Sequence, residues 1–179
     1  MQAVQAGQLD ALGELFERHH GAVYQFLSRT TGCPALAEDL VQEVFVRILK
    51  YRHTFDAAHR FETWLFRIAR STRADHFRRQ RPEDGVDGAL LEVAAPEPTP
   101  AAQLEQAADI RQLERALAEL GDDTRDLLVL ARYHAMPYGR IAHLLGIETG
   151  AVKVRVHRAM KQLRTQFFRL EDTSCAVKK

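Results

Sequence analysis

The sequence has 179 residues, of which 46% are hydrophobic and 27% charged, and its formal net charge is +1. This length suits one ordinary domain or two small ones, and no uninterrupted apolar run is long enough to span a bilayer, so we expect no membrane insertion. The N-terminal segment lacks the basic and apolar regions of a secretory signal. The two cysteines, Cys33 and Cys175, form no metal-ligand pattern, so we expect a cytoplasmic protein with free thiols and no metal.

Apolar residues recur at helical spacing through the first half of the chain. A first helical stretch is broken at residues 31–34, where a glycine allows a turn and a proline removes a helix donor. A second helix over residues 36–50 carries a wide apolar stripe. After a loop at residues 53–60, a long basic helix starts at Phe61. Trp64 shares the apolar spacing of this helix, so we predict that its ring belongs to the core.

A proline-rich segment then separates two helical regions. Residues 82–103 contain four prolines and few large apolar residues, and between residues 82 and 109 there are seven acidic residues and no basic one. We therefore predict a flexible acidic linker. No strand-like alternation appears, which predicts an all-α fold with helical domains at residues 1–81 and 104–168. The tail at residues 169–179 is predicted to be disordered.

Basic residues gather in two blocks on either side of this linker. Residues 60–81 hold seven arginines against two acids, and residues 127–169 hold eight lysines and arginines against Glu148. Two such blocks on one chain favour two nucleic-acid contacts, although a solvated charged face would give the same pattern.

The second basic block contains a helix-turn-helix pattern. Pro137 can open a short helix that ends at Gly146, and Thr149 leads into a second helix. This arrangement presents the second helix to the major groove, where basic side chains neutralise phosphates and reach base edges. A plain helical hairpin would also fit. The outward basic side chains of the second helix are Lys153, Arg155, His157, Arg158 and Lys161.

Three segments resemble one bacterial family. Gly150-Ala-Val-Lys-Val-Arg-Val-His-Arg-Ala159 is similar to the recognition helix of extracytoplasmic-function sigma factors. Asp39-Leu-Val-Gln-Glu-Val-Phe45 resembles that family's polymerase-binding stretch. The sequence Phe61-Glu-Thr-Trp-Leu-Phe-Arg-Ile-Ala-Arg70 resembles its promoter-melting segment. The resemblance covers residues 9–81 and 104–164 in the family's order. The departures are Ser71 in place of asparagine, Ala151 in place of threonine, Val154 in place of serine, and Gly139-Arg140 where an acid is common.

The resemblance implies an alternative sigma factor in which a domain 2 bundle is joined to a domain 4 with the helix-turn-helix. By resemblance, the side chains that dock on core RNA polymerase are Asp39, Gln42 and Glu43. Those that contact the −10 region of promoter DNA are His53, Phe55, Arg60, Arg67, Arg70, Arg78 and Arg79, and the basic residues of the recognition helix read the −35 region. An anti-sigma factor is a further implied partner, released by a signal. No cofactor or small-molecule substrate is implied.

Other classes of function were weighed against the residues. The adjacent histidines His19 and His20 cannot share one helix face, and no catalytic constellation or phosphate-binding glycine loop is apparent, so we do not expect an enzyme. Two alternatives stay open. One is a sequence-specific regulator with an N-terminal sensing bundle, which would bind DNA without polymerase. The other is a protein-interaction bundle with no dependence on DNA.

Overall fold

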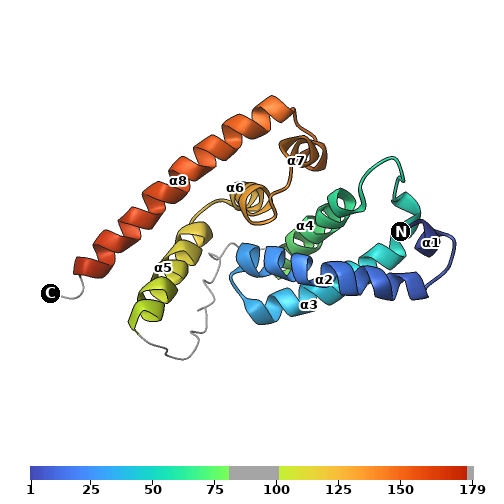
Figure 1. The fold of residues 1–179 in the computed structure, drawn as a ribbon, viewed down its shortest axis with the longest axis horizontal. Helices are drawn as coiled ribbons and strands as arrows, with labels where there is room; N and C mark the ends of the chain where they lie inside the picture. The colour runs from blue at the N-terminus through green and yellow to red at the C-terminus, as the bar shows by residue number, and fades with distance from the viewer. Residues whose placement is uncertain (81–100, 177–179) are drawn as a thin grey trace.

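The computed structural model describes the backbone of residues 1–80 and 101–176 and the side chains of residues 1–80 and 108–170. Within these residues the chain is helical and has no strand, which confirms the all-α prediction (Figure 1). The helices are α1 (Gln2–Gln5), α2 (Asp10–Thr31), α3 (Pro34–Lys50), α4 (Phe61–Gln80), α5 (Ala101–Ala118), α6 (Asp122–Leu128), α7 (Tyr138–Leu145) and α8 (Thr149–Ala176), with a 3₁₀ turn at Arg52–Thr54 and a π-type turn at Val129–Tyr133.

Helices α1 to α4 form the N-terminal bundle, in which α2 and α3 lie side by side and α4 packs on both. The chain reverses between α2 and α3 at Gly32, which has a left-handed φ of 71°, and Pro34 occupies the first turn of α3. Phe26, Ile48 and Leu65 are fully buried in this bundle. The short α1 is attached because the Gln5 side-chain amide donates to the backbone carbonyls of Arg52 and Phe55.

Helices α5 to α8 form the C-terminal part, in which α5 and α6 pack against the long α8. Leu117, Leu128 and Ala159 form a small apolar cluster between these helices. The Arg125 guanidinium donates to three backbone carbonyls at the end of α5 and so satisfies acceptors that the helix leaves unpaired. Gly146, with a φ of 66°, closes α7 and allows the tight turn into α8.

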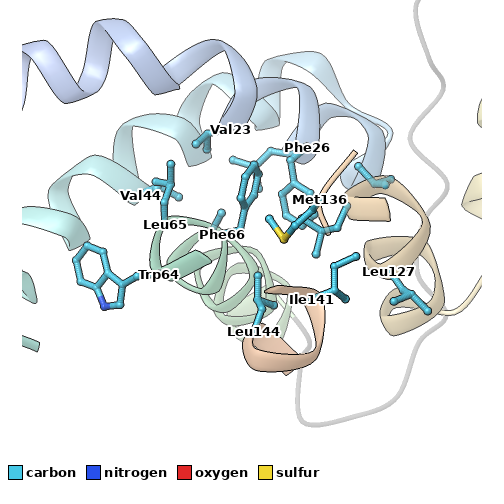
Figure 2. Packing of buried hydrophobic residues seen from close by; sticks show 14 of the residues in the cluster. Val23, Phe26, Val44, Trp64, Leu65, Phe66, Leu127, Met136, Ile141 and Leu144 are labelled. Atoms are coloured by element: carbon cyan, nitrogen blue, oxygen red, sulfur yellow. The ribbon is translucent and has the colours of Figure 1, made fainter. Parts of the chain in front are cut away.

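One apolar core continues from the N-terminal bundle into the C-terminal part. The ring of Phe66 on α4 lies edge-on to Phe26 of α2, with ring centroids 5.4 Å apart. Across from them, Met136, Ile141 and Leu144 of the C-terminal part are buried in the same cluster (Figure 2). Helix α7 therefore packs directly on α4, and the two parts share a dry interface.

Two boundaries differ from the sequence prediction. The predicted linker lies outside the described residues up to residue 100, and α5 begins at Ala101, inside its last three residues. Helix α8 continues to Ala176, into the segment predicted to be a disordered tail. It is held along α5 because Gln112 donates to the Phe167 carbonyl and Arg169 pairs with Glu119 at 3.1 Å. Among the described residues, no helix is long and apolar enough to cross a membrane.

Candidate nucleic-acid interface

The recognition helix predicted from the sequence is the first half of α8. Val152, Val156 and Ala159 are buried against α6 and α7, and this spacing turns the opposite faces of the helix to solvent. All the side chains predicted to read the −35 region are exposed: Lys153, Arg155, His157, Arg158 and Lys161. The helix therefore presents a row of hydrogen-bond donors and positive charge of the kind that binds a DNA groove.

The arginines of α4 divide into two groups. Arg78 and Arg79 near its end are exposed, and their partners are acids of the N-terminal bundle: Arg78 pairs with Asp75 at 2.7 Å and Arg79 lies 3.8 Å from Glu43. Arg67 and Arg70, nearer its start, face the C-terminal part instead. Three of these four arginines, Arg67, Arg78 and Arg79, are exposed, and Arg70 is partly buried against the C-terminal part.

The loop before α4 was predicted, by resemblance, to contact the −10 region through His53, Phe55 and Arg60. His53 and Arg60 are exposed, as a contact with DNA requires. The prediction for Phe55 needs correction, because only 8% of this residue is exposed. Its ring packs edge-on against Trp64, with centroids 5.5 Å apart, and belongs to the core. The prediction that Trp64 is a core residue is confirmed.

The predicted polymerase-binding side chains lie on the outer face of α3. Asp39 and Gln42 are exposed, whereas the Glu43 carboxylate is held by Arg47, which donates to it over 2.6 Å. Arg47 also donates to Asp75 of α4 over 2.6 Å, and this hydrogen bond lowers the pKa of the Asp75 carboxyl below its ordinary value. Glu43 is therefore part of a network that joins α3 to α4.

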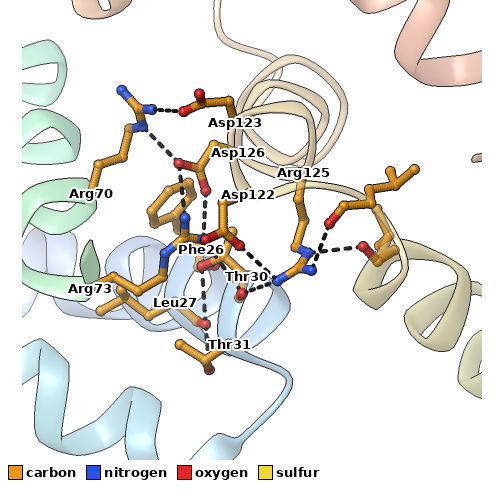
Figure 3. Close-up of polar contacts among 12 residues, drawn as sticks. Phe26, Leu27, Thr30, Thr31, Arg70, Arg73, Asp122, Asp123, Arg125 and Asp126 are labelled. Atoms are coloured by element: carbon orange, nitrogen blue, oxygen red, sulfur yellow. Dashed lines mark hydrogen bonds and ion pairs between the residues drawn. The ribbon is translucent and has the colours of Figure 1, made fainter. Parts of the chain in front are cut away.

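A second charge network joins α4 to α6 (Figure 3). Asp126 is only 1% exposed, and Arg73 of α4, itself 4% exposed, lies 2.7 Å from its carboxylate. The Nε of Arg70 donates to the same carboxylate over 2.7 Å, and its Nη2 donates to Asp123 over 2.9 Å. Burial raises the pKa of Asp126, and the two arginines oppose this effect. Arg70 and Arg73 of α4 thus meet Asp126 of α6, more than 50 residues away in the sequence, in one network around a buried carboxylate.

Two histidines lie at the same boundary. The ring of His134 contacts those of Phe26 and Phe66, and burial, together with the charge of Arg29, lowers its pKa. The ring of His143 on α7 stacks on His59 of the loop before α4, with centroids 4.3 Å apart. Among the described residues, no group of histidine, cysteine and carboxylate side chains could hold a metal ion.

Family models match both parts of the chain. The model of Sigma-70 region 2 matches residues 15–83, and the model of Sigma-70 region 4 matches residues 110–163. The RNA polymerase sigma factor CarQ of Myxococcus xanthus is 34% identical over 96% of this chain and 97% of its own length. The ECF RNA polymerase sigma factor SigF of Caulobacter vibrioides is also 34% identical, over 82% of this chain and 79% of its own.

The chain is an extracytoplasmic-function sigma factor. Its fold agrees with this assignment: CnrH, solved in complex with the cytosolic domain of CnrY, is 27% identical and superposes with a TM-score of 0.64 over 96% of this chain and 94% of its own. The N-terminal bundle of this sigma factor is then region 2, and the part with the helix-turn-helix is region 4.

Sequence reasoning missed the residues that connect the two regions of the sigma factor. Arg73 was counted only within a basic block, and neither Arg125 nor Asp126 was assigned a role. A signal was present in part, since Asp126 directly precedes an apolar run that begins at Leu127, where an unpaired acid would be costly to bury. The pattern does not identify the basic partner, which lies 53 residues away in the sequence.

Proposed function

We propose that this sigma factor binds core RNA polymerase through the outer face of α3 and directs it to promoters that region 2 and region 4 contact together. The observation that carries the proposal is the row of exposed basic side chains on α8, the second helix of the helix-turn-helix. In addition, α3 exposes Asp39 and Gln42 in the segment that resembles the family's polymerase-binding stretch. The protein then acts in the cytoplasm as a specificity subunit, with no catalytic step of its own.

Each DNA contact has a separate role in this proposal. The side chains of α8 read the −35 region in the major groove, those nearest its N-terminus reaching base edges and those further along contacting phosphates. The −10 region is contacted by the loop residues His53 and Arg60 and by the α4 side chains Arg67, Arg70, Arg78 and Arg79. Phe55 is left out of this set because its ring is buried.

We further propose that an anti-sigma factor holds the protein inactive until a signal releases it. Support comes from CnrH, a structural relative that was solved with another protein chain, the cytosolic domain of CnrY, bound to it. Co-purification of this chain with the product of a neighbouring gene would test the assignment, provided that the bound form fails to support transcription and the freed form supports it.

Run-off transcription tests the main proposal. Core RNA polymerase would be mixed with DNA from the genomic neighbourhood of this gene, with and without the protein. We expect specific new transcripts that require both components. A specific duplex shift by the protein alone, without transcripts, would instead favour a classical helix-turn-helix regulator. The absence of both transcripts and a duplex shift would favour a protein-interaction bundle.

Two variants test the assigned surfaces. Asp39→Ala with Gln42→Ala should weaken binding to core polymerase, and Glu17→Ala, which removes an exposed charge from α2, is the matched control. Unchanged affinity of the double variant would refute the α3 assignment. Arg158→Ala should cost about 1–3 kcal/mol of promoter binding and relax specificity at one position if the side chain reads a base. An equal loss on every promoter would assign it to phosphate alone.

A further inference from the structure

Two of the side chains that region 2 would turn to the −10 region, Arg67 and Arg70, contact region 4 in this structure. Arg70 is bound by both Asp123 and Asp126 of α6. Arg67 donates to the backbone carbonyl of His143 on α7 over 3.2 Å. These contacts use one nitrogen of Arg67 and two of Arg70, so α6 and α7 compete with DNA phosphates for these two side chains while they lie on α4.

The recognition helix is turned toward the same place. Arg155 and Arg158 of α8 line one groove of about 390 Å³ together with Arg70 of α4 and Asp123 of α6. In this arrangement Arg155 and Arg158 of region 4 therefore lie beside Arg70 of region 2, where a promoter held by both regions would have to separate them.

The contact between the two regions combines the shared apolar core with a charge network centred on Asp126. Its carboxylate is the partner of Arg73 and Arg70, and both it and Arg73 are almost fully buried (Figure 3). On the other side of the carboxylate, Arg125 of α6 donates over 2.8 Å to the Thr30 carbonyl at the end of α2. Without the acid, three guanidinium groups would be left close together at a dry boundary, which strongly disfavours the contact.

The same contact can open when a competing partner is available. The attraction within a buried ion pair is largely offset by the loss of hydration, so such a pair gives orientation more than tightness. When α6 moves away, Arg70, Arg73 and Asp126 all regain water. A partner that binds only the open form can then shift the population toward it.

We propose that the contact of Asp126 with Arg70 and Arg73 is an autoinhibitory latch, which holds α6 and α7 over the promoter-facing side of α4 and must break before the protein engages a promoter. The proposal rests on the promoter-directed function proposed above. In the open state the promoter-facing side of α4 binds the promoter, and in the closed state it binds region 4 of the same chain.

Asp126→Asn tests the latch in the free protein, and Asp122→Asn is the matched control. Both changes remove one negative charge from α6, but Asp122 is 71% exposed and contacts neither α4 arginine. We expect Asp126→Asn to increase the affinity of the free protein for a fluorescent single strand of the −10 region by roughly tenfold or more, since truncating one member of a buried charge pair has effects of this size. The control should bind like the wild type. Unchanged affinity of Asp126→Asn, with a native circular dichroism spectrum, would overturn the latch.

A reversible cross-link tests the closed form without changing the ion cluster. His59→Cys and His143→Cys, in a background with Cys33→Ser and Cys175→Ser, place two thiols where the histidine rings stack. A bismaleimide with a disulfide in its spacer joins them, and a reductant cuts the spacer. We expect specific transcription to fall about tenfold or more in the cross-linked protein and to return after reduction.

The outcomes of this experiment separate the two proposals. If the wild-type protein supports no transcription with core polymerase, the proposed function is wrong. If the wild type is active and the cross-linked protein is equally active, the latch is wrong. If no intramolecular cross-link forms, the closed arrangement is not populated in solution and the latch is also wrong.

Discussion

Phe66→Ala should strongly destabilise the protein, because this ring connects three parts of the core. Phe66 is 4% exposed on α4, and its ring lies 5.4 Å from that of Phe26 on α2 and 4.8 Å from that of His134, which follows α6. Removing it leaves a space whose walls belong to different helices, so no single neighbouring side chain can collapse into it.

The expected loss is about 3–5 kcal/mol of unfolding free energy, from the lost burial of the ring and the cavity that remains. For a chain of this length, that corresponds to a fall in Tm of roughly 6–20 °C. It is also a large share of the roughly 5–15 kcal/mol by which proteins are stable, so the variant should be folded only marginally at 37 °C.

Urea unfolding would measure this loss, with Phe77→Ala as the control. Phe77 is an aromatic residue of the same helix but is 37% exposed, so its truncation should cost within about 0.5 kcal/mol. Trp64, the single tryptophan of the chain, lies in the region 2 core and reports on that region by fluorescence, while circular dichroism reports on all helices. Equal costs for the two variants, or a cost below 1 kcal/mol for Phe66→Ala, would refute the shared core.

The remaining predictions concern pH and backbone strain. Because burial lowers the pKa of His134, the unfolded chain binds a proton at this residue more readily than the folded chain does, so the Tm should fall as the pH drops through about 6.5. The Tm of His134→Phe should fall less over the same pH range, and parallel curves of Tm against pH for the two proteins would contradict this. Because Arg47 lowers the pKa of Asp75, the contribution of this ion pair to stability is present above about pH 4 and lost below it. The Tm difference between wild type and Arg47→Met should therefore shrink on acidification, and a difference that stays constant with pH would contradict this contribution. Gly146→Ala should cost about 1–2 kcal/mol in urea unfolding because φ is positive there. Gly139→Ala, within α7 with open space around its Cβ, should instead stabilise by about 0.4–1 kcal/mol; similar effects would argue against the strain.

Features that depend on neighbouring residues could be predicted from the sequence. The proline at the start of α3 and the glycine that ends α7 mark real helix boundaries, because they act through the local backbone. Apolar spacing placed Trp64 in the core and turned the basic side chains of α8 outward. The motifs of these helices were also enough to predict the family.

Phe55 shows where a local interpretation fails. It stands in the loop to which the family resemblance assigns contact with the −10 region, so its ring was predicted to contact DNA. The fold instead places this ring against Trp64, and the Gln5 side chain of the adjacent helix α1 donates to the Phe55 carbonyl. Only the packing of α1 and α4 around the loop decides that Phe55 is buried.

The amino-acid sequence by itself determines the helices, their amphipathic faces, the helix-turn-helix and the membership of the sigma factor family, because each follows from residues close together in the chain. The tertiary structure alone decides that Arg70 and Arg73 meet Asp126 and that α7 covers α4. A charge pattern shows that arginines and acids are present but not which of them pair. Pairing across more than 50 residues is set by how the apolar faces pack, and this packing turns predicted DNA contacts into contacts between the two halves of the protein.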